Sequence, residues 1–173
     1  RPRTGSFVYH SKEIDLIETQ IKKVKSLPVN GIVIGVLTEK NDLPLKILTR
    51  LVRLAKPLDL TFHRAFDSVN NPIESMKKLI EIGFNRILTS GQQTTAEKGL
   101  NMLLKLKDEA NGKITIMPGG GINDMNCNLF LKNGFKEIHL SAKKKYIGKV
   151  YEPIADEEII KKVVSTSLLY RNK

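Results

Sequence analysis

The sequence has one cysteine, no tryptophan and only 6% aromatic residues among its 173 positions. A lone Cys127 cannot form an internal disulfide, which favours a reducing compartment: the cytosol, with the nucleus as the alternative. The longest apolar stretch, residues 31–37, falls far short of the roughly 20 residues that a membrane span needs, so we expect no membrane association. The first residues, Arg1 to Thr4, include no apolar segment of a secretory signal. With 40% hydrophobic and 27% charged residues, the composition indicates one globular domain.

Acidic residues are also scarce, with 18 Asp and Glu against 29 Lys and Arg, for a net charge of +11. Such an excess is compatible with binding nucleic acid or other polyanions. The basic residues are nevertheless dispersed, and only Lys143, Lys144 and Lys145 form a run. We therefore interpret most of them as solvated helix faces and keep nucleic-acid binding through this run as the weaker alternative.

Five short apolar runs rich in β-branched residues begin near residues 32, 60, 87, 114 and 138, at spacings of 28, 27, 27 and 24. Each is too short for a helix and typical of a buried parallel strand. Amphipathic patterns between them predict helices, for example over residues 45–54, and one more helix is expected before the first run, over residues 11–27. The alternation predicts a parallel sheet with right-handed crossovers.

Local signals mark several helix ends. Asn71 before Pro72 predicts a helix start, and Thr94 with Glu97 fits a capping box. Asn123 is positioned to cap a helix that runs to residue 131, while Gly83 and Gly134 stand where helices should end.

Two architectures are compatible with this alternation, an open doubly wound sheet and a (β/α)8 barrel. A barrel typically needs about 250 residues, and this chain has five clear strand–helix units with one extra helix before them. By count alone, the open sheet is favoured.

Polar and small residues recur where each predicted strand ends, and in parallel sheets ligands bind at the carboxyl ends of the strands. They are His63, Arg64 and Asp67 after the second run, Ser90 after the third, Gly119, Gly120 and Gly121 after the fourth, and His139 and Ser141 after the fifth, with Arg1 and Arg3 at the end of a truncated strand.

The glycine run and the nearby basic and hydroxyl side chains predict an anion-binding site for phosphate or carboxylate. Three glycines let the backbone approach a ligand, and the helix expected at Asn123 would offer unpaired N–H groups. The predicted anion-binding residues are Arg1, Arg3, Arg64, Ser90, Gly119, Gly120, Gly121 and Ser141. The alternative is a sharp strand-to-helix turn that requires positive φ.

His63, Asp67 and His139 are candidates for general acid–base catalysis, because imidazole titrates near neutral pH. The alternatives are metal ligation and hydrogen-bonded histidines that close the core. The chain has no Cys-x-x-Cys, His-Glu-x-x-His or Met-x-x-Met spacing, so no metal ligands are assigned. Cys127 is interpreted as a packed helix residue, Ser90 has no nucleophile elbow, and the glycine run lacks the dinucleotide-binding order.

Six motifs at these strand ends resemble the CutC copper homeostasis family, in the order in which that family has them. They are residues 1–3 (Arg-Pro-Arg), 35–38 (Gly-Val-Leu-Thr), 61–67 (Thr-Phe-His-Arg-Ala-Phe-Asp), 86–91 (Arg-Ile-Leu-Thr-Ser-Gly), 117–121 (Met-Pro-Gly-Gly-Gly) and 139–142 (His-Leu-Ser-Ala). Thr4 departs from the glycine usual there, and the match fades after Ala142, so residues 143–153 correspond to a variable segment.

The resemblance overrides the strand count and implies an α/β fold of the TIM (β/α)8 barrel type, here incomplete, with about strands 3–8. Residues 1–173 would form a single partial barrel domain that begins at the end of strand three, consistent with a first residue that is not Met. Such a partial barrel should either fold poorly alone or associate through its open edges, with a homo-oligomer as the candidate assembly.

The family also implies a cytosolic protein linked to copper homeostasis, with a copper ion as a candidate ligand. The other candidate ligand, a small anion, follows from the strand-end residues and not from the family. Copper is implied by the resemblance only, and no residue of this chain inherits a copper-ligand role, because the cysteines proposed for copper in animal members lie upstream of the matching region. The alternative function is a metabolic barrel enzyme for a small phosphorylated or carboxylated substrate.

Overall fold

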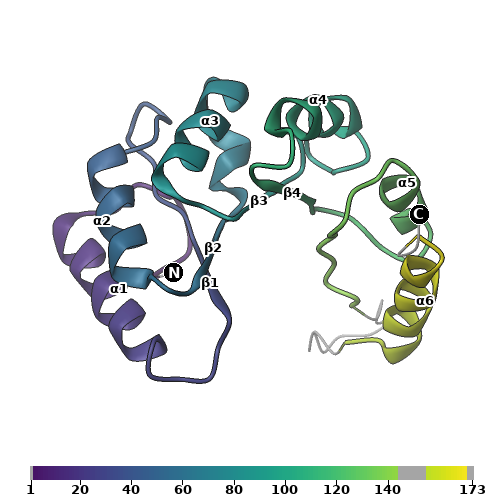
Figure 1. Cartoon of the computed structure of the whole chain (residues 1–173), viewed down its shortest axis with the longest axis horizontal. Helices are drawn as coiled ribbons and strands as arrows, with labels where there is room; N and C mark the ends of the chain where they lie inside the picture. The colour runs from purple at the N-terminus through teal and green to yellow at the C-terminus, as the bar shows by residue number, and fades with distance from the viewer. Residues whose placement is uncertain (1, 144–154, 171–173) are drawn as a thin grey trace.

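The computed structural model describes residues 2–143 and 155–170, and Figure 1 shows the strands on the inside of an arc with the helices along its outside. The elements are α1 (Ser11–Val24), β1 (Gly31–Ile34), α2 (Leu45–Ala55), β2 (Asp59–Phe62), the 3-10 helix η1 (Arg64–Ser68), α3 (Pro72–Ile82), β3 (Arg86–Thr89), α4 (Leu100–Ala110), β4 (Thr115–Pro118), α5 (Cys127–Lys132) and α6 (Glu157–Leu168).

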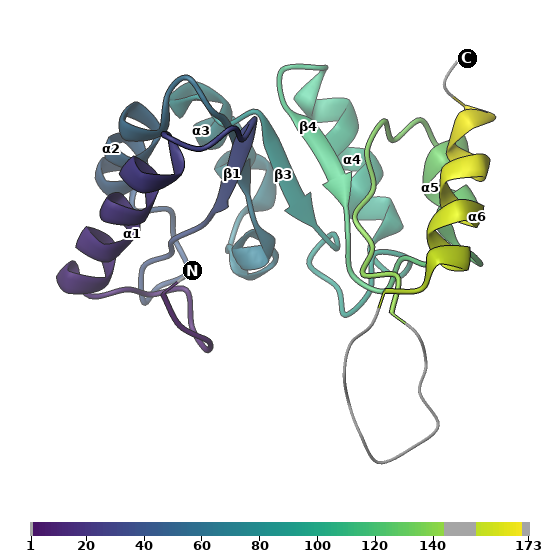
Figure 2. The same cartoon turned by 90° about the horizontal axis from the view of Figure 1, so that it is seen from below.

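The four strands form one parallel sheet in the order β1-β2-β3-β4. Ile32 is paired with Leu60, and Ile87 joins Phe62 to Ile116 across the next two ladders. All strands therefore end at the same edge, where η1 and the loops after β3 and β4 lie (Figure 2). The predicted alternation of parallel strands and helices is confirmed.

The fifth apolar run does not become a regular strand. It follows β4 with a single parallel bridge between Gly119 and His139, whose N–H donates to the carbonyl of Pro118. The chain then bends at Ala142, which has a φ of 40°, and its carbonyl accepts from the N–H of Asp156. This bend ends the pairing before a ladder can develop.

In the part of the chain that the structure describes, helices cover only the convex face of the sheet (Figure 1). This is the arrangement in part of a (β/α)8 barrel, whereas a doubly wound sheet has helices on both faces. In β1, Ile32 and Ile34 face α1, whereas Val33 points to the concave side and is 57% exposed. Fully buried Phe62, Phe66 and other large side chains fill the layer between sheet and helices. The fold is thus an incomplete TIM-barrel-like α/β fold, as the resemblance implied.

The helix ends agree with the sequence in part. Asn71 Oδ1 accepts from the N–H of Glu74 at the start of α3, and Gly83 ends that helix with a φ of 100°. The expected start at Thr94 was wrong: α4 begins at Leu100, and in the turn before it the hydroxyl of Thr95 accepts from the N–H of Lys98. The N–H of Ala96 donates to the carbonyl of Gly120 and joins this turn to the loop after β4.

The helix expected from Asn123 begins four residues later, at Cys127. Asn123 caps a turn instead, since its Oδ1 accepts from the N–H of Met125 and its N–H donates to Asn126 Oδ1. Within residues 2–143 and 155–170, no helix has the length and apolar character needed to cross a bilayer.

Candidate functional site

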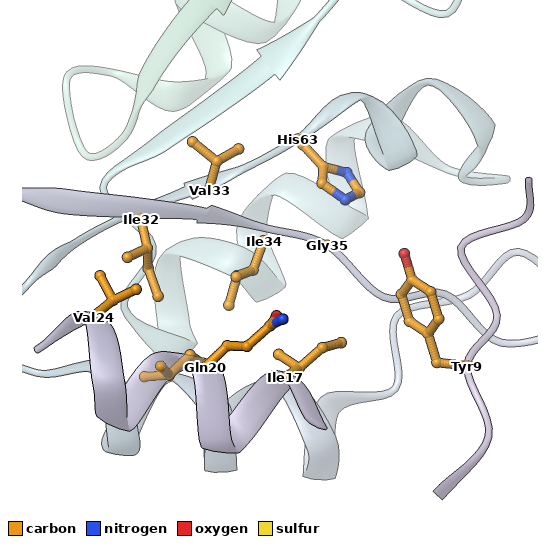
Figure 3. A pocket seen from close by; sticks show the side chains of 10 residues that line it. Tyr9, Ile17, Gln20, Val24, Ile32, Val33, Ile34, Gly35 and His63 are labelled. Atoms are coloured by element: carbon orange, nitrogen blue, oxygen red, sulfur yellow. The ribbon is translucent and has the colours of Figure 1, made fainter. Parts of the chain in front are cut away.

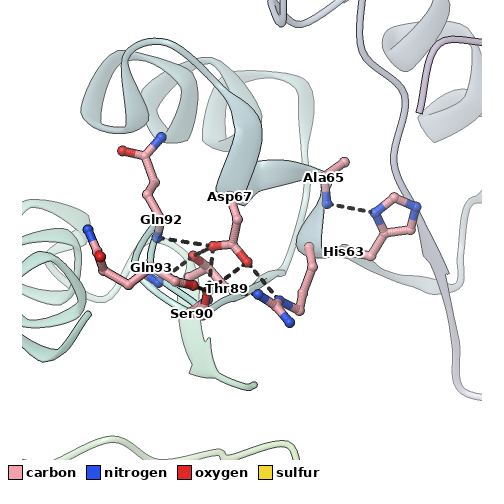
Figure 4. Close-up of polar contacts among 9 residues, drawn as sticks. His63, Ala65, Asp67, Thr89, Ser90, Gln92 and Gln93 are labelled. Atoms are coloured by element: carbon pink, nitrogen blue, oxygen red, sulfur yellow. Dashed lines mark hydrogen bonds and ion pairs between the residues drawn. The ribbon is translucent and has the colours of Figure 1, made fainter. Parts of the chain in front are cut away.

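The candidate site is built around η1, the short helix that follows β2. His63 precedes it, and its Nδ1 accepts from the N–H of Ala65 at 3.1 Å, which caps the first turn. The imidazole lies over Gly35, where a Cβ would come within 2.5 Å of two ring atoms, and against Phe7, at 4.7 Å between ring centroids. Figure 4 shows that His63 and Asp67 point to opposite sides of η1.

Asp67 is the centre of a hydrogen-bond network that joins η1 to the end of β3 (Figure 4). Its Oδ1 accepts from the hydroxyl of Thr89 and from the N–H groups of Ser90 and Gln92, the latter two at 2.9 and 3.2 Å. Its Oδ2 accepts from Arg64 Nε at 2.7 Å and lies 3.0 Å from Ser90 Oγ. These donors replace the water that the carboxylate loses on burial.

Arg64 is held in one orientation by this network. In addition to its bond to Asp67, its Nη2 donates to Ser90 Oγ at 2.9 Å. The third nitrogen, Nη1, lies over Gly120: a Cβ on that glycine, whose φ is 111°, would come within 3.2 Å of it. The side chain is 42% exposed, so one edge of a fixed guanidinium faces solvent beside a glycine loop. A positioned, partly exposed guanidinium suits planar oxyanions.

Ser90 connects the two charged groups. Its side chain is fully buried, and its single hydroxyl hydrogen can go either to Asp67 Oδ2 or to the carbonyl of Gln93, while its oxygen accepts from Arg64. Ser90 therefore helps to hold Arg64 and Asp67 together, in addition to being a polar group of the network.

The predicted residues of the fourth and fifth strand ends are spread along the same edge. Gly119 belongs to the sheet, because its N–H donates to the carbonyl of Thr89 and a Cβ there would lie 2.4 Å from Leu88 Cδ1. Gly121 follows with a φ of 75°, and His139 and Ser141 are both exposed. The structure thus gathers Arg64, Asp67, Ser90 and Gly120, with His139 and Ser141 on the next segment.

Arg3 is engaged within its own loop. Its guanidinium donates to Glu13, with Nε at 2.6 Å from Oε1, and to the carbonyls of Thr4, Ser6 and Val8. The N–H of His10 and the guanidinium of Arg3 hold the pKa of Glu13 below its ordinary value. Arg1, the other predicted arginine of this segment, lies outside the described residues.

A groove of about 260 Å³ separates α1 from β1 on the other side of His63 (Figure 3). Its walls are apolar side chains such as Ile17 and Ile34, with Tyr9, Gln20 and His63 as the polar groups. The buried hydroxyl of Tyr9 has no hydrogen-bond partner in the described part of the chain. The sequence patterns predicted neither this groove nor the hydrogen bonds of Thr89 and Gln92 to Asp67. Thr89 belongs to one of the motifs that resemble the family, whereas no sequence pattern pointed to Gln92 or Tyr9.

The described residues do not fit a thiolate copper site. Cys127 is fully buried in α5, with its Sγ 3.7 Å from the carbonyl of Asp124. Met125 is 87% exposed, and residues 2–143 and 155–170 include no cluster of three His, Cys, Asp or Glu side chains that could hold a metal ion.

Comparison with known proteins gives consistent matches. The CutC family model matches residues 1–144. The copper homeostasis protein cutC homolog of Mus musculus is 41% identical over 144 residues, which cover 83% of this chain and 53% of that protein. The family protein CutC of Parabacteroides distasonis is 42% identical, covering 83% of this chain and 59% of its own length. The chain therefore spans somewhat more than half the length of these curated relatives.

Two solved structures are also similar. CutC from Streptococcus agalactiae has a TM-score of 0.77 at 31% identity, over 80% of this chain and 69% of its own. A structure described as native KDPGal has a TM-score of 0.59 at 12% identity, over 90% of this chain and 66% of that one, and shows likeness of fold alone.

Proposed function

This chain belongs to the CutC family, and from that premise we propose that it serves copper homeostasis and binds a small anion, phosphate or carboxylate, at the carboxyl end of its sheet. The observation that carries the anion site is the Arg64 guanidinium, bonded to Asp67 and Ser90 and resting on Gly120. The single cysteine favours a cytosolic setting.

Three features support anion binding at this place. Arg64 already has its orientation, so a ligand does not have to order a flexible side chain. Its exposed edge lies beside Gly120, where the absence of a side chain allows a ligand to approach both the guanidinium and the backbone. Finally, the site lies where successive strands end, the usual binding edge of such folds.

The test is a titration with inorganic phosphate at constant ionic strength, followed by amide chemical shifts. We expect saturable shifts at Gly120 and Gly121, and a loss of affinity of about tenfold in Arg64→Gln, as for one charge-assisted contact. The control is Arg50→Gln, which removes the same charge from the exposed face of α2, where Arg50 pairs with Glu18. Equal weakening in both variants would show only nonspecific attraction to a basic protein and refute the site.

The link to copper rests on membership of the family. No described residue is assigned as a copper ligand, because the described side chains do not fit a soft-ligand site. Competition of the chain with a Cu(I) chelator, repeated with Cys127→Ser, tests the point. We expect the variant to bind as the parent does, since Cys127 is fully buried. A tenfold loss in the variant would assign copper to Cys127.

A second candidate is an enzyme acting on a small phosphorylated or carboxylated substrate, with His63, Asp67 and His139 in acid–base roles. It is favoured by their position at one edge of the sheet, His63 and Asp67 after β2 and His139 on the segment that pairs with the end of β4. His139→Gln separates the two candidates: an enzyme would lose turnover while phosphate affinity stays the same, whereas a binding protein would show no turnover to lose.

A further inference from the structure

We propose that His63 is a positioning residue of the anion site: as a neutral imidazole it caps η1 and so holds Arg64 and Asp67 in place. The inference rests on the proposed anion site, since it concerns how that site keeps its geometry. It differs from a direct role of His63 as a cationic ligand or as a general base acting through Nδ1.

The hydrogen bond to Ala65 determines which form of the ring fits. An imidazole nitrogen that accepts a hydrogen bond carries no proton, so a neutral His63 has its proton on Nε2. A doubly protonated ring has N–H groups at both nitrogens, and Nδ1–H would then face the N–H of Ala65. Protonation therefore removes the cap and sets two donors against each other.

The ring has little freedom to avoid this conflict. On one face it lies over Gly35, close enough that even a Cβ there would overlap it, and Phe7 packs against it at 4.7 Å. A rotation that moved Nδ1 away from Ala65 would have to displace the strand end or the Phe7 ring. We therefore expect the backbone of η1, which is five residues long and carries Arg64 and Asp67, to adjust instead.

The groups around His63 determine how the pH dependence should be interpreted. Tyr9, on the loop before α1, is the titratable group that shares the groove with His63, and Gln20 of α1 is polar but uncharged. Asp67 of η1 lies on the opposite side (Figure 4), and Arg64 donates to it. His139 lies on the segment after β4 and takes no part in this cap.

The capping role predicts an unusual direction for the change of anion affinity with pH. A histidine that contacts an anion directly binds it more tightly as the pH falls and the ring becomes positive. A histidine that must stay neutral to hold Arg64 does the reverse, so anion affinity should fall as the ring is protonated. The two roles thus differ in direction and not only in size.

The probe is sulfate, whose charge does not change between pH 8 and pH 5.5. For the parent chain, we expect sulfate affinity to drop by up to about fivefold over this range, the factor equivalent to the free energy of a typical N-cap. In His63→Asn, where the amide oxygen can cap η1 without titrating, this drop should disappear. His63→Ala should bind weakly at both pH values, and His10→Asn, which removes another histidine at a helix start, should keep the parent behaviour.

Affinity that rises or stays constant as the pH falls, after subtraction of the His63→Asn profile, would overturn the proposal. The subtraction removes every pH dependence that does not come from His63. Imidazole nitrogen shifts give an independent measurement. At pH 8 they should report a proton on Nε2, and a proton on Nδ1 would disprove the cap directly. If sulfate binds at no pH, the proposed function fails, while these nitrogen shifts still decide the role of His63.

Discussion

Replacing Asp67 with asparagine should destabilise the fold well beyond the loss of one surface charge. Both carboxylate oxygens accept from N–H donors: Oδ1 from Ser90 and Gln92, and Oδ2 from Arg64. Whichever way an asparagine amide is turned, its NH2 group faces at least one of these donors. One charge-assisted bond is lost and at least one buried donor stays unpaired, which together cost about 3 kcal/mol.

Urea denaturation measured by circular dichroism tests this value, because the free energy of unfolding extrapolates linearly to water. The free energy of unfolding of a typical domain is about 5–15 kcal/mol, so the expected loss is easily measured. Asp108→Asn is the matched control: Asp108 is exposed on α4, and its replacement should stay within about 0.5 kcal/mol. A loss below about 1 kcal/mol for Asp67→Asn would refute the idea that this carboxylate organises the site.

Two further predictions concern ion pairs outside the site. The pKa of Glu13 is lowered mainly by the N–H of His10 and then by Arg3. Glu13 therefore stabilises the fold above the ordinary glutamate pKa of about 4.3, and this stability is lost as the pH falls through the lowered pKa. Arg3→Gln should move the pKa of Glu13 upward in a carboxyl NMR titration, and an ordinary pKa in the parent would contradict the structure. Arg86 of β3 donates through Nε and Nη2 to both oxygens of Glu137, which raises the pKa of Arg86. A lysine at this position cannot form both hydrogen bonds, so Arg86→Lys should lower the free energy of unfolding by about 1–2 kcal/mol. A lysine variant as stable as the parent would show that the paired hydrogen bonds are unimportant for stability.

Much of the fold follows from local rules that can be applied to the sequence alone. The cap at Asn71 and the left-handed end at Gly83 depend on residues within one helix, and both were predicted correctly. The start of α4 was not: Thr95, and not Thr94, caps the turn before it, and the N–H of Ala96 joins that turn to the carbonyl of Gly120, which is distant in the sequence.

The candidate site shows the same division. The regular spacing of strands placed Arg64, Ser90 and Gly120 at one edge of the sheet, and the structure brings these three together. Spacing could not show that His63 points away from Asp67, because successive residues of a 3-10 turn project in different directions. Nor could it show that Gln92 would bind Asp67, since that contact depends on how the loop after β3 folds back.

By itself, the sequence determined the alternation of strands and helices, the parallel direction of the sheet and the edge at which polar groups collect, because hydrophobic periodicity and turn chemistry are local properties. The tertiary structure decided which polar groups meet. Hydrogen bonds such as those of Asp67 join segments that approach only after the sheet has formed, and close contacts such as that of His63 with Gly35 depend on the space between neighbouring strands.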